Sequence, residues 1–179
     1  MTELSGHALQ KKVCLLGSYA VGKTSLVRRF VESIFNDRYL ATVGVKIDRK
    51  RVNVGGRDLN LVLWDLAGDD DVGQSKPSHV RGASGYILVA DGCRRSTVDK
   101  AIAIQERAES RSGSVPVVVA LNKVDLKSDW EIDKADIERL SQKGWPCLHT
   151  SARTGNGVNA LFITLAEKIL LETNEHTSG

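Results

Sequence analysis

Gly17-Ser18-Tyr19-Ala20-Val21-Gly22-Lys23-Thr24 is the stretch that decides the fold of this chain, and it lies between an apolar run and a helical pattern. It fits G-x-x-x-x-G-K-[ST], a loop whose glycines let successive backbone N–H groups turn inward towards phosphate oxygens. The helix that begins near Gly22 directs the positive end of its dipole at the same anion. We expect Lys23 to reach the β- and γ-phosphates and the Thr24 hydroxyl to ligate Mg²⁺. A turn that binds nothing is the alternative, and the rest of the chain decides between the two.

Length and charge place the chain among ordinary globular domains. Its 179 residues are enough for one domain that buries about two-thirds of its unfolded surface. The 25 basic and 22 acidic residues nearly balance, for a net charge of +3. Two short basic clusters, Lys11-Lys12 and Arg49-Lys50-Arg51, are typical of solvated strand ends, so we expect no nucleic-acid partner.

The three cysteines bear on where the protein works. Cys14, Cys93 and Cys147 each lie among apolar residues and share no metal-ligand spacing, which predicts reduced core thiols and a cytoplasmic location. The chain has neither an apolar signal segment nor a stretch long enough to span a bilayer. Residues 172–179 contain no cysteine, so we expect no lipid anchor in this chain.

Short apolar runs alternate with helical patterns along the chain, which predicts an α/β domain with a mostly parallel sheet. Residues 1–10 are expected to form a flexible leader, 11–172 the domain and 173–179 a tail. The expected strands are 13–16, 43–54, 59–63, 86–90, 115–121 and 147–149. Four helices are expected. The first begins near Gly22 and has an apolar face that includes Ile34. The others begin at a Ser96-x-x-Asp99 capping box, at Asp133 and before Leu161.

One pair of strands differs from the rest. Residues 43–54 and 59–63 alternate apolar and polar side chains on either side of Gly55-Gly56, which predicts a hairpin and hence an antiparallel edge strand. We therefore expect six strands with helices on both faces.

Chemistry suited to one ligand follows several of these strands. Asp65 ends a strand, where its carboxylate can hold Mg²⁺ through water, and Gly68 offers an N–H group to a γ-phosphate. Asn122-Lys123-x-Asp125 follows another strand. A carboxylate at Asp125 can accept both donors on the Watson–Crick edge of guanine, whereas adenine presents an acceptor there. Because loops at the carboxyl ends of parallel strands converge, we expect a single nucleotide site.

The order and spacing of G-x-x-x-x-G-K-T, W-D-x-A-G, N-K-x-D and S-A-R resemble the Ras superfamily of small GTPases, over about residues 11–171. Three stretches are similar to the Rab or Rab-like branch: Tyr39-x-x-Thr42-Val43-Gly44-Val45, Trp64-Asp65-Leu66-Ala67-Gly68 and Arg81-Gly82. The resemblance implies a P-loop NTPase fold of the Ras-like G-domain type. It implies GTP/GDP and Mg²⁺ as cofactors and a magnesium-dependent GTP hydrolase activity.

The resemblance also assigns roles to individual positions. Phe35 matches an aromatic residue that packs against guanine, with a plain core residue as the less favoured alternative. Tyr39 matches a residue that covers the phosphates. Asn122 is expected to brace the loops, Lys123 to lie over the base, and Ser151 to support Asp125. Ala152 is expected to donate its N–H group to the guanine O6 atom, and Arg153 to stack where the family has lysine.

Three sets of site residues follow. The expected catalytic residues are Lys23, Thr42, Gly68 and Asp69, and the expected metal ligands are Thr24, Thr42 and Asp65. The expected nucleotide contacts are Gly17, Ala20, Val21, Gly22, Lys23, Thr24, Ser25, Phe35, Tyr39, Asn122, Lys123, Asp125, Ser151, Ala152 and Arg153.

Two positions depart from the family pattern. Asp69 stands where a glutamine usually orients the attacking water, and its charge opposes the γ-phosphate. Tyr19 occupies a loop position that usually carries a small residue, and its phenol crowds the space for an arginine finger. Both changes predict slow hydrolysis. Three polar residues in neighbouring loops are weaker candidates for compensating: Arg38, Gln74 and His79.

Three functions therefore compete. The first is a GTPase that switches between GTP and GDP through residues 36–45 and 66–82, signals to effectors, and is served by an exchange factor and possibly by an activating protein. The second is a pseudo-GTPase that holds nucleotide constitutively and binds a partner. The third, an ATP-using P-loop enzyme, is disfavoured by Asp125.

Overall fold

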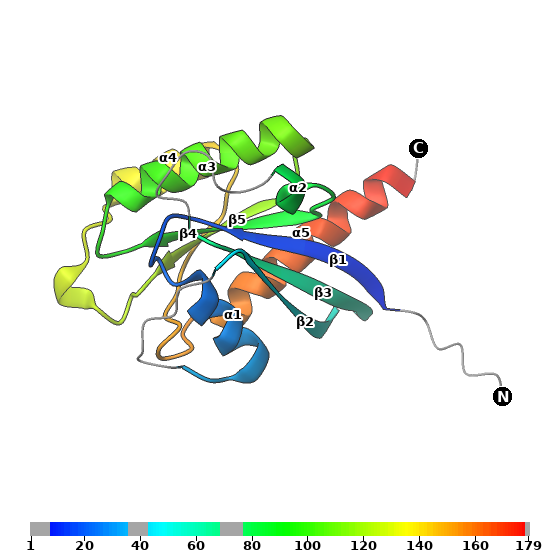
Figure 1. Cartoon of the computed structure of the whole chain (residues 1–179), viewed down its shortest axis with the longest axis horizontal. Helices are drawn as coiled ribbons and strands as arrows, with labels where there is room; N and C mark the ends of the chain where they lie inside the picture. The colour runs from blue at the N-terminus through cyan, green and yellow to red at the C-terminus, as the bar shows by residue number, and fades with distance from the viewer. Residues whose placement is uncertain (1–7, 36–42, 69–76, 178–179) are drawn as a thin grey trace.

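A six-stranded β-sheet forms the centre of the computed structural model, which describes residues 8–35, 43–68 and 77–177 (Figure 1). The strands lie in the order β2-β3-β1-β4-β5-β6; β2 is antiparallel to β3 and all other neighbours are parallel. This arrangement confirms the expected α/β class with one antiparallel edge strand. The strand bounds are β1 Leu9–Leu16, β2 Val45–Val54, β3 Arg57–Leu66, β4 Gly85–Asp91, β5 Val117–Asn122 and β6 Cys147–His149.

Helices cover both faces of the sheet, with α1 and α5 on one face and α3 and α4 on the other (Figure 1). Their bounds are α1 Lys23–Glu32, α2 Pro77–Val80, α3 Ser96–Ser112, α4 Lys134–Gln142 and α5 Val158–Thr177, with a 3₁₀ turn at Lys127–Asp129. The sequence did not predict α2, which is a single turn. β1 begins before the expected domain boundary at residue 11, and α5 continues past the expected boundary at 172.

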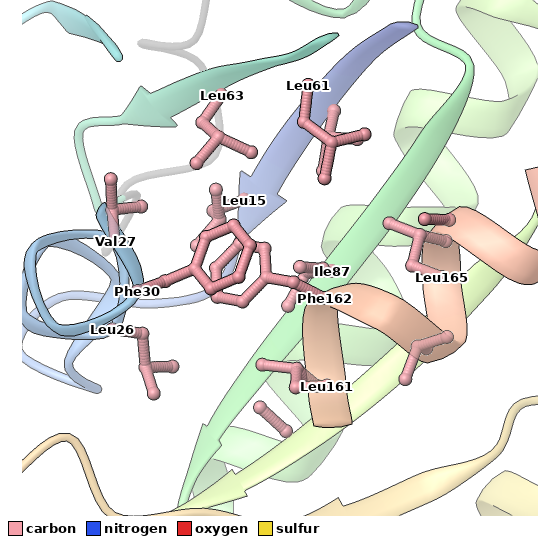
Figure 2. Close-up of a cluster of buried hydrophobic side chains, with 14 of the residues drawn as sticks. Leu15, Leu26, Val27, Phe30, Leu61, Leu63, Ile87, Leu161, Phe162 and Leu165 are labelled. Carbon is pink, nitrogen blue, oxygen red and sulfur yellow. The ribbon is translucent and has the colours of Figure 1, made fainter. Parts of the chain in front are cut away.

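The central strand β1 contributes to two hydrophobic cores because its side chains alternate between the faces of the sheet. Val13 and Leu15 pack in the core with α1 and α5, where the rings of Phe30 and Phe162 stack with their centroids 4.0 Å apart (Figure 2). Cys14 belongs to the core on the opposite face, beneath α3 and α4. Burial on both faces explains why this strand appears in the sequence as a continuous apolar run.

The end of α1 corrects one prediction. Ser33 still donates its N–H group to the Arg29 carbonyl at 3.0 Å, but its left-handed conformation, with φ of 57°, stops the helix after Glu32. Ile34 therefore lies outside the helix and is 50% exposed instead of sharing its apolar face.

The helix starts give one confirmation and one correction. Asp133 caps α4, accepting a hydrogen bond from the Asp136 N–H group, while the Asp136 carboxylate accepts one from the Asp133 N–H group in return. The capping box predicted at Ser96 is wrong, because the cap residue of α3 is Arg95 and no side chain caps it. Thr97 ties this helix to the sheet instead, since its hydroxyl accepts the N–H group of Asp91 at 2.8 Å.

All three cysteines are free thiols, but only Cys14 is fully buried. Burial raises the pKa of the Cys14 thiol to about 12, against a smaller opposing effect of the Lys12 charge, and raises the pKa of Cys147 to about 11. Cys147 is partly buried and packs against the same core as Cys14, whereas Cys93 lies nearer the surface, so the expectation of core thiols fails for Cys93. Among the described residues, none of the helices combines the length and apolarity needed to cross a membrane.

Candidate nucleotide-binding site

The loop from Gly17 to Thr24 lies beside the topological switch point of the sheet, where the order of the strands along the chain reverses. β1 has β3 on one side and β4 on the other, so connections leave it towards opposite halves of the sheet. In open α/β sheets, ligands bind at the carboxyl ends of the strands beside such a switch point. The loop joins β1, which ends at Leu16, to α1, which begins at Lys23. The topology therefore places this loop at the position where the fold binds ligands.

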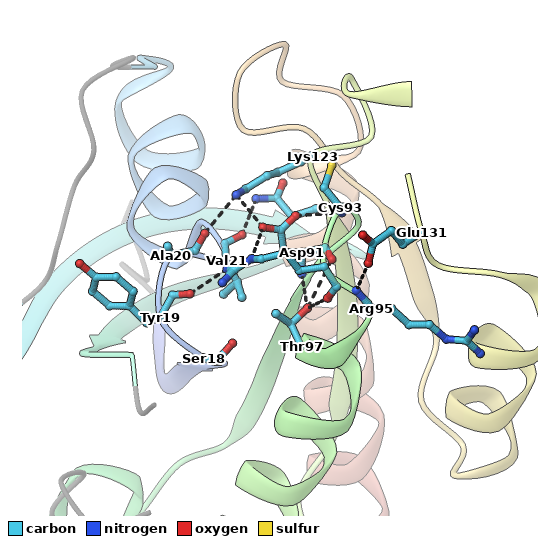
Figure 3. A network of polar contacts seen from close by, with 12 residues as sticks. Ser18, Tyr19, Ala20, Val21, Asp91, Cys93, Arg95, Thr97, Lys123 and Glu131 are labelled. Carbon is cyan, nitrogen blue, oxygen red and sulfur yellow. Dashed lines mark hydrogen bonds and ion pairs between the residues drawn. The ribbon is translucent and has the colours of Figure 1, made fainter. Parts of the chain in front are cut away.

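Gly22 is required by the shape of this loop. Its φ of 104° is one that side chains rarely adopt, and a Cβ atom there would lie 2.3 Å from the Asn122 Nδ2 atom. The close approach lets Asn122 donate to the Val21 carbonyl at 3.0 Å, while Lys123 Nζ donates to the Ala20 carbonyl at 3.1 Å (Figure 3). Asn122 and Lys123, which directly follow β5, therefore hold the loop from outside.

Lys23 and Thr24 begin α1 and lie at the mouth of the loop. The Lys23 ammonium donates to the carbonyl oxygens of Gly17 at 2.8 Å and Ser18 at 3.0 Å, and the residue is only 6% exposed. Thr24 Oγ1 donates to Asp65 Oδ2 at 2.5 Å. Ser25 follows in the first turn of the helix. A buried positive charge and a hydroxyl are thus set side by side where the helix dipole is positive.

The oxygen atoms of Thr24 and Asp65 fit a magnesium ion. Mg²⁺ takes hard oxygen ligands, commonly one or two carboxylates together with water and substrate phosphates. Asp65 is 1% exposed at the end of β3, and its carboxylate contacts the Thr24 hydroxyl. Thr42, the third expected ligand, lies outside the described residues.

Gly68 brings the end of β3 against the loop of residues 17–24, which we call the phosphate loop. A Cβ atom at this position would lie 2.6 Å from the Tyr19 Cα atom and 3.0 Å from the Ser18 carbonyl carbon, so only glycine permits the contact. Tyr19 itself is 45% exposed. The Ala67 N–H group donates to the Gly44 carbonyl at 2.9 Å, which joins the described ends of the two expected switch segments.

The loops that follow β5 and β6 carry the residues expected to contact the guanine base, and we call them the base-side loops. Hydrogen bonds join the two loops into one unit. Ser151 Oγ donates to Asp125 Oδ1 at 2.7 Å, and Thr150 Oγ1 donates to Asn122 Oδ1 at 3.1 Å. The backbone joins them as well, because the Val124 N–H group donates to the Thr150 carbonyl at 3.0 Å. The structure thus brings Asn122, Lys123, Asp125 and Ser151 together at the same edge of the sheet as the phosphate loop.

Arg29 connects α1 to the loop that carries Ala152. Its Nε atom donates to the Ala152 carbonyl at 2.8 Å, its Nη2 atom donates to the Arg153 carbonyl, and its Nη1 atom donates to the Ser33 carbonyl at 3.3 Å. One helix therefore holds the phosphate loop at its first turn and the base loop at its last. The guanidinium thereby holds the loop that carries the Ala152 N–H group, which is expected to contact the guanine O6 atom.

Substituting Arg29 with methionine is expected to speed the release of GDP about tenfold, the effect of losing ~1.4 kcal/mol of charge-assisted hydrogen bonding. Release of a fluorescent GDP analogue measures this rate. Arg28→Met is the matched control, because Arg28 pairs with Glu32 at 3.5 Å on the surface of the same helix. Equal release rates for the two variants would contradict the role of Arg29.

The remaining predicted residues are placed as follows. Phe35 is partly buried and packs against the core beneath α1, so its contact with guanine stays a prediction. Arg153 is exposed, and its carbonyl accepts from Arg29. His79 lies in α2, where its carbonyl accepts the Cys14 thiol at 3.5 Å. Four positions lie outside the described residues: Arg38, Tyr39, Asp69 and Gln74.

Sequence reasoning missed three residues at this site: Arg29, Asp91 and Arg94. Asp91 ends β4, at the same edge of the sheet as Asp65 and Asn122, so its position in the strand was the available signal. No motif marks the two arginines.

A phosphate loop at the switch point of an α/β sheet, with base-side loops beside it, defines a P-loop nucleotide-binding protein. The Ras family model matches residues 12–171. The chain is 32% identical to the Ras-related protein Rab-21 of Mus musculus over 98% of its own length and 81% of that protein. It is 36% identical to Rab-21 of Geodia cydonium (90% and 72%) and 31% identical to Rab-13 of Canis lupus familiaris (94% and 84%). The chain belongs to the Ras family and is a Rab-like small GTPase.

Proposed function

We propose that this protein is a guanine-nucleotide switch that binds Mg²⁺ together with GTP and hydrolyses the GTP slowly. The observation that carries the proposal is the arrangement of Lys23, Thr24 and Asp65 beside the phosphate loop, with Asp125 and Ser151 on the base side. Its direct test is to identify the nucleotide that co-purifies with the protein and to measure its single-turnover hydrolysis. A chain that carries no guanine nucleotide, or that prefers ATP in competition, would overturn it.

Guanine selectivity is assigned to Asp125. Ser151 donates to one oxygen of its carboxylate, which orients the group and leaves acceptor capacity for the two donors of the guanine edge. The neighbouring Ala152 is 4% exposed, and Arg29 holds its carbonyl, which fixes the loop that carries the Ala152 N–H group.

Magnesium is assigned to the oxygen atoms of Thr24 and Asp65, where the ion would neutralise charge on the β- and γ-phosphates. Chelating magnesium is expected to speed GDP release at least about tenfold, since those phosphate contacts are charge-assisted. The Asp65→Asn variant is expected to release GDP fast with or without a chelator. Asp58→Asn, on the exposed start of the same strand, is the control that should keep the chelator effect. A rate of GDP release from the wild-type protein that is the same with and without a chelator would contradict the assignment.

Slow hydrolysis is assigned to Asp69 and Tyr19. Gly68 lies against the Tyr19 backbone, and Tyr19 is exposed at this end of the site. Asp69 directly follows Gly68 in the sequence. A carboxylate cannot donate a hydrogen bond to the transferring phosphoryl group, and its charge adds to the charge already there. A single-turnover rate equal to that of a relative with glutamine at this position would contradict slow turnover.

A pseudo-GTPase that serves as a nucleotide-loaded binding module is the second candidate, favoured by the same two residues. The two candidates differ in whether the γ-phosphate changes the protein. Hydrogen exchange over residues 36–45 and 66–82 should slow when GDP is replaced by a non-hydrolysable GTP analogue if the protein is a switch. Identical exchange in both states would favour the binding module.

The proposed partners of the switch are an effector, an exchange factor and possibly an activating protein. All of them are proposed to bind the two switch segments, residues 36–45 and 66–82, in the cytoplasm. The hydrogen bond between Ala67 and Gly44 joins the bases of these segments, so a change in one is passed to the other.

A further inference from the structure

Three consecutive carbonyl groups of the phosphate loop each accept a hydrogen bond from a side chain outside the loop (Figure 3). Asn122 donates to the Val21 carbonyl and Lys123 to the Ala20 carbonyl. The third donor is Arg94, whose Nη2 atom lies 2.8 Å from the Tyr19 carbonyl oxygen. Arg94 follows β4 and belongs to none of the motifs recognised in the sequence.

Asp91 links two of these three donors. Its Oδ2 atom accepts from Arg94 Nε at 2.9 Å and from Lys123 Nζ at 2.7 Å, and its Oδ1 atom accepts the Cys93 N–H group at 3.0 Å. The residue is 2% exposed. Burial alone would raise the pKa of this carboxyl, but the hydrogen bonds from Lys123, Arg94 and the Cys93 N–H group outweigh it and hold the pKa below its ordinary value. The pair is therefore charged at neutral pH.

The geometry of the peptide group gives these contacts a consequence inside the loop. In a trans peptide the carbonyl of one residue and the N–H group of the next share a plane and point in opposite directions. Holding the Tyr19 carbonyl outward therefore turns the Ala20 N–H group inward, and Lys123 and Asn122 do the same for Val21 and Gly22. Consecutive inward N–H groups are what a phosphate-binding nest requires.

We propose that Arg94 and Asp91 form a positioning pair that holds the Ala20 N–H group towards the phosphates and thereby slows nucleotide release. The inference rests on the proposed binding of guanine nucleotide in this loop. Arg94 acts through the Tyr19 peptide and is not itself a contact of the nucleotide.

The neighbouring Arg95 provides a matched comparison. It has the same side chain and similar exposure, but its guanidinium pairs with Asp136 at 2.9 Å and Asp133 at 3.3 Å on the start of α4. Removing Arg95 breaks ion pairs at the start of α4, one of them to the buried Asp136 carboxylate, which Arg139 also contacts at 3.6 Å, without touching the phosphate loop. A difference between the two substitutions therefore reports on the contact with Tyr19 and not on the loss of a positive charge.

The test measures release of a fluorescent GDP analogue from the full chain in the presence of Mg²⁺. Arg94→Met is expected to speed release about three- to tenfold, the range for one partly exposed hydrogen-bonding side chain. Arg95→Met should stay within about twofold of the wild-type rate, because its ion-pair partners Asp133 and Asp136 lie in α4 and its cap and not in the phosphate loop. Arg94→Lys should fall between, because one ammonium cannot reproduce the two-sided contact of a guanidinium.

A second readout separates positioning of the phosphate loop from general loosening of the site. IDP lacks the amino group that Asp125 recognises, so the ratio of GDP to IDP affinity measures base recognition. Arg94→Met should leave this ratio unchanged, whereas a general structural defect would lower it.

The outcomes distinguish the two proposals. Wild-type release from Arg94→Met, an equal acceleration in Arg95→Met, or a reduced GDP to IDP ratio would each overturn the positioning role while leaving the proposed function intact. A wild-type chain that retains no guanine nucleotide would overturn the proposed function and this inference with it.

Discussion

GDP binding to an Asp125→Asn variant is expected to be weaker by a factor of about 10² to 10⁴, because two hydrogen bonds to a charged acceptor are worth roughly 3–6 kcal/mol. The carboxylate accepts both donors of the guanine edge, whereas an asparagine amide can present only its oxygen to one of them and sets its NH₂ group against the other. The Ser151 hydroxyl can still donate to the asparagine oxygen, so the loop keeps its internal contact. Equilibrium titration with a fluorescent GDP analogue measures the loss.

The same variant makes a positive prediction. Xanthine carries a carbonyl group where guanine carries its exocyclic amine, so an asparagine amide can donate to it, and XDP should bind Asp125→Asn better than it binds the wild-type protein. Asp129→Asn is the matched control, because Asp129 is an exposed carboxylate in the 3₁₀ turn that follows the same loop. Retention of GDP affinity in Asp125→Asn would remove the basis for guanine selectivity.

The fold was readable from the sequence because its strands are buried in ways that leave a pattern. Every residue of β4 and β5 is buried, and both strands appear as apolar runs that end in a single polar residue, Asp91 or Asn122. The hairpin was marked by Gly55 and Gly56, which both have positive φ, at 57° and 80°. Local details were harder, because the end of α1 depends on the conformation of Ser33 and the start of α3 on a contact with Asp91.

The loops of the candidate site could be located from topology, but the side chains that support them could not. Asp65 and Asn122 stand in motifs at strand ends, and the structure places both at the edge of the sheet beside the phosphate loop. Arg29 reaches the Ala152 carbonyl, which lies 123 residues away in the sequence. Arg94 likewise reaches back 75 residues to Tyr19. Contacts from long side chains to distant backbone leave no periodic or spacing signal.

Asp69→Gln is expected to accelerate single-turnover GTP hydrolysis by about ten- to a hundredfold, somewhat less than the effect of one well-placed transition-state donor. We expect the glutamine oxygen to accept from the attacking water and its NH₂ group to donate to the transferring phosphoryl group. The substitution also removes a negative charge that is expected to oppose the γ-phosphate. Rapid-quench measurement of phosphate from protein preloaded with GTP gives the rate. Asp69 lies outside the described residues, so this expectation rests on its place in the sequence directly after Gly68.

The neighbouring acidic residues supply the control that decides what Asp69 does. Asp70→Gln removes the same charge from the same acidic run, Asp69-Asp70-Asp71, without placing an amide at the position after Gly68. If the charge of this acidic run slows hydrolysis, both variants should accelerate it. If orientation of water limits hydrolysis, only Asp69→Gln should. Adding Tyr19→Ser to Asp69→Gln then tests the exposed phenol, which is expected to matter mainly when an activating protein must insert an arginine. No acceleration in Asp69→Gln would show that another feature of the site limits turnover, and the proposal of slow hydrolysis through Asp69 would fail.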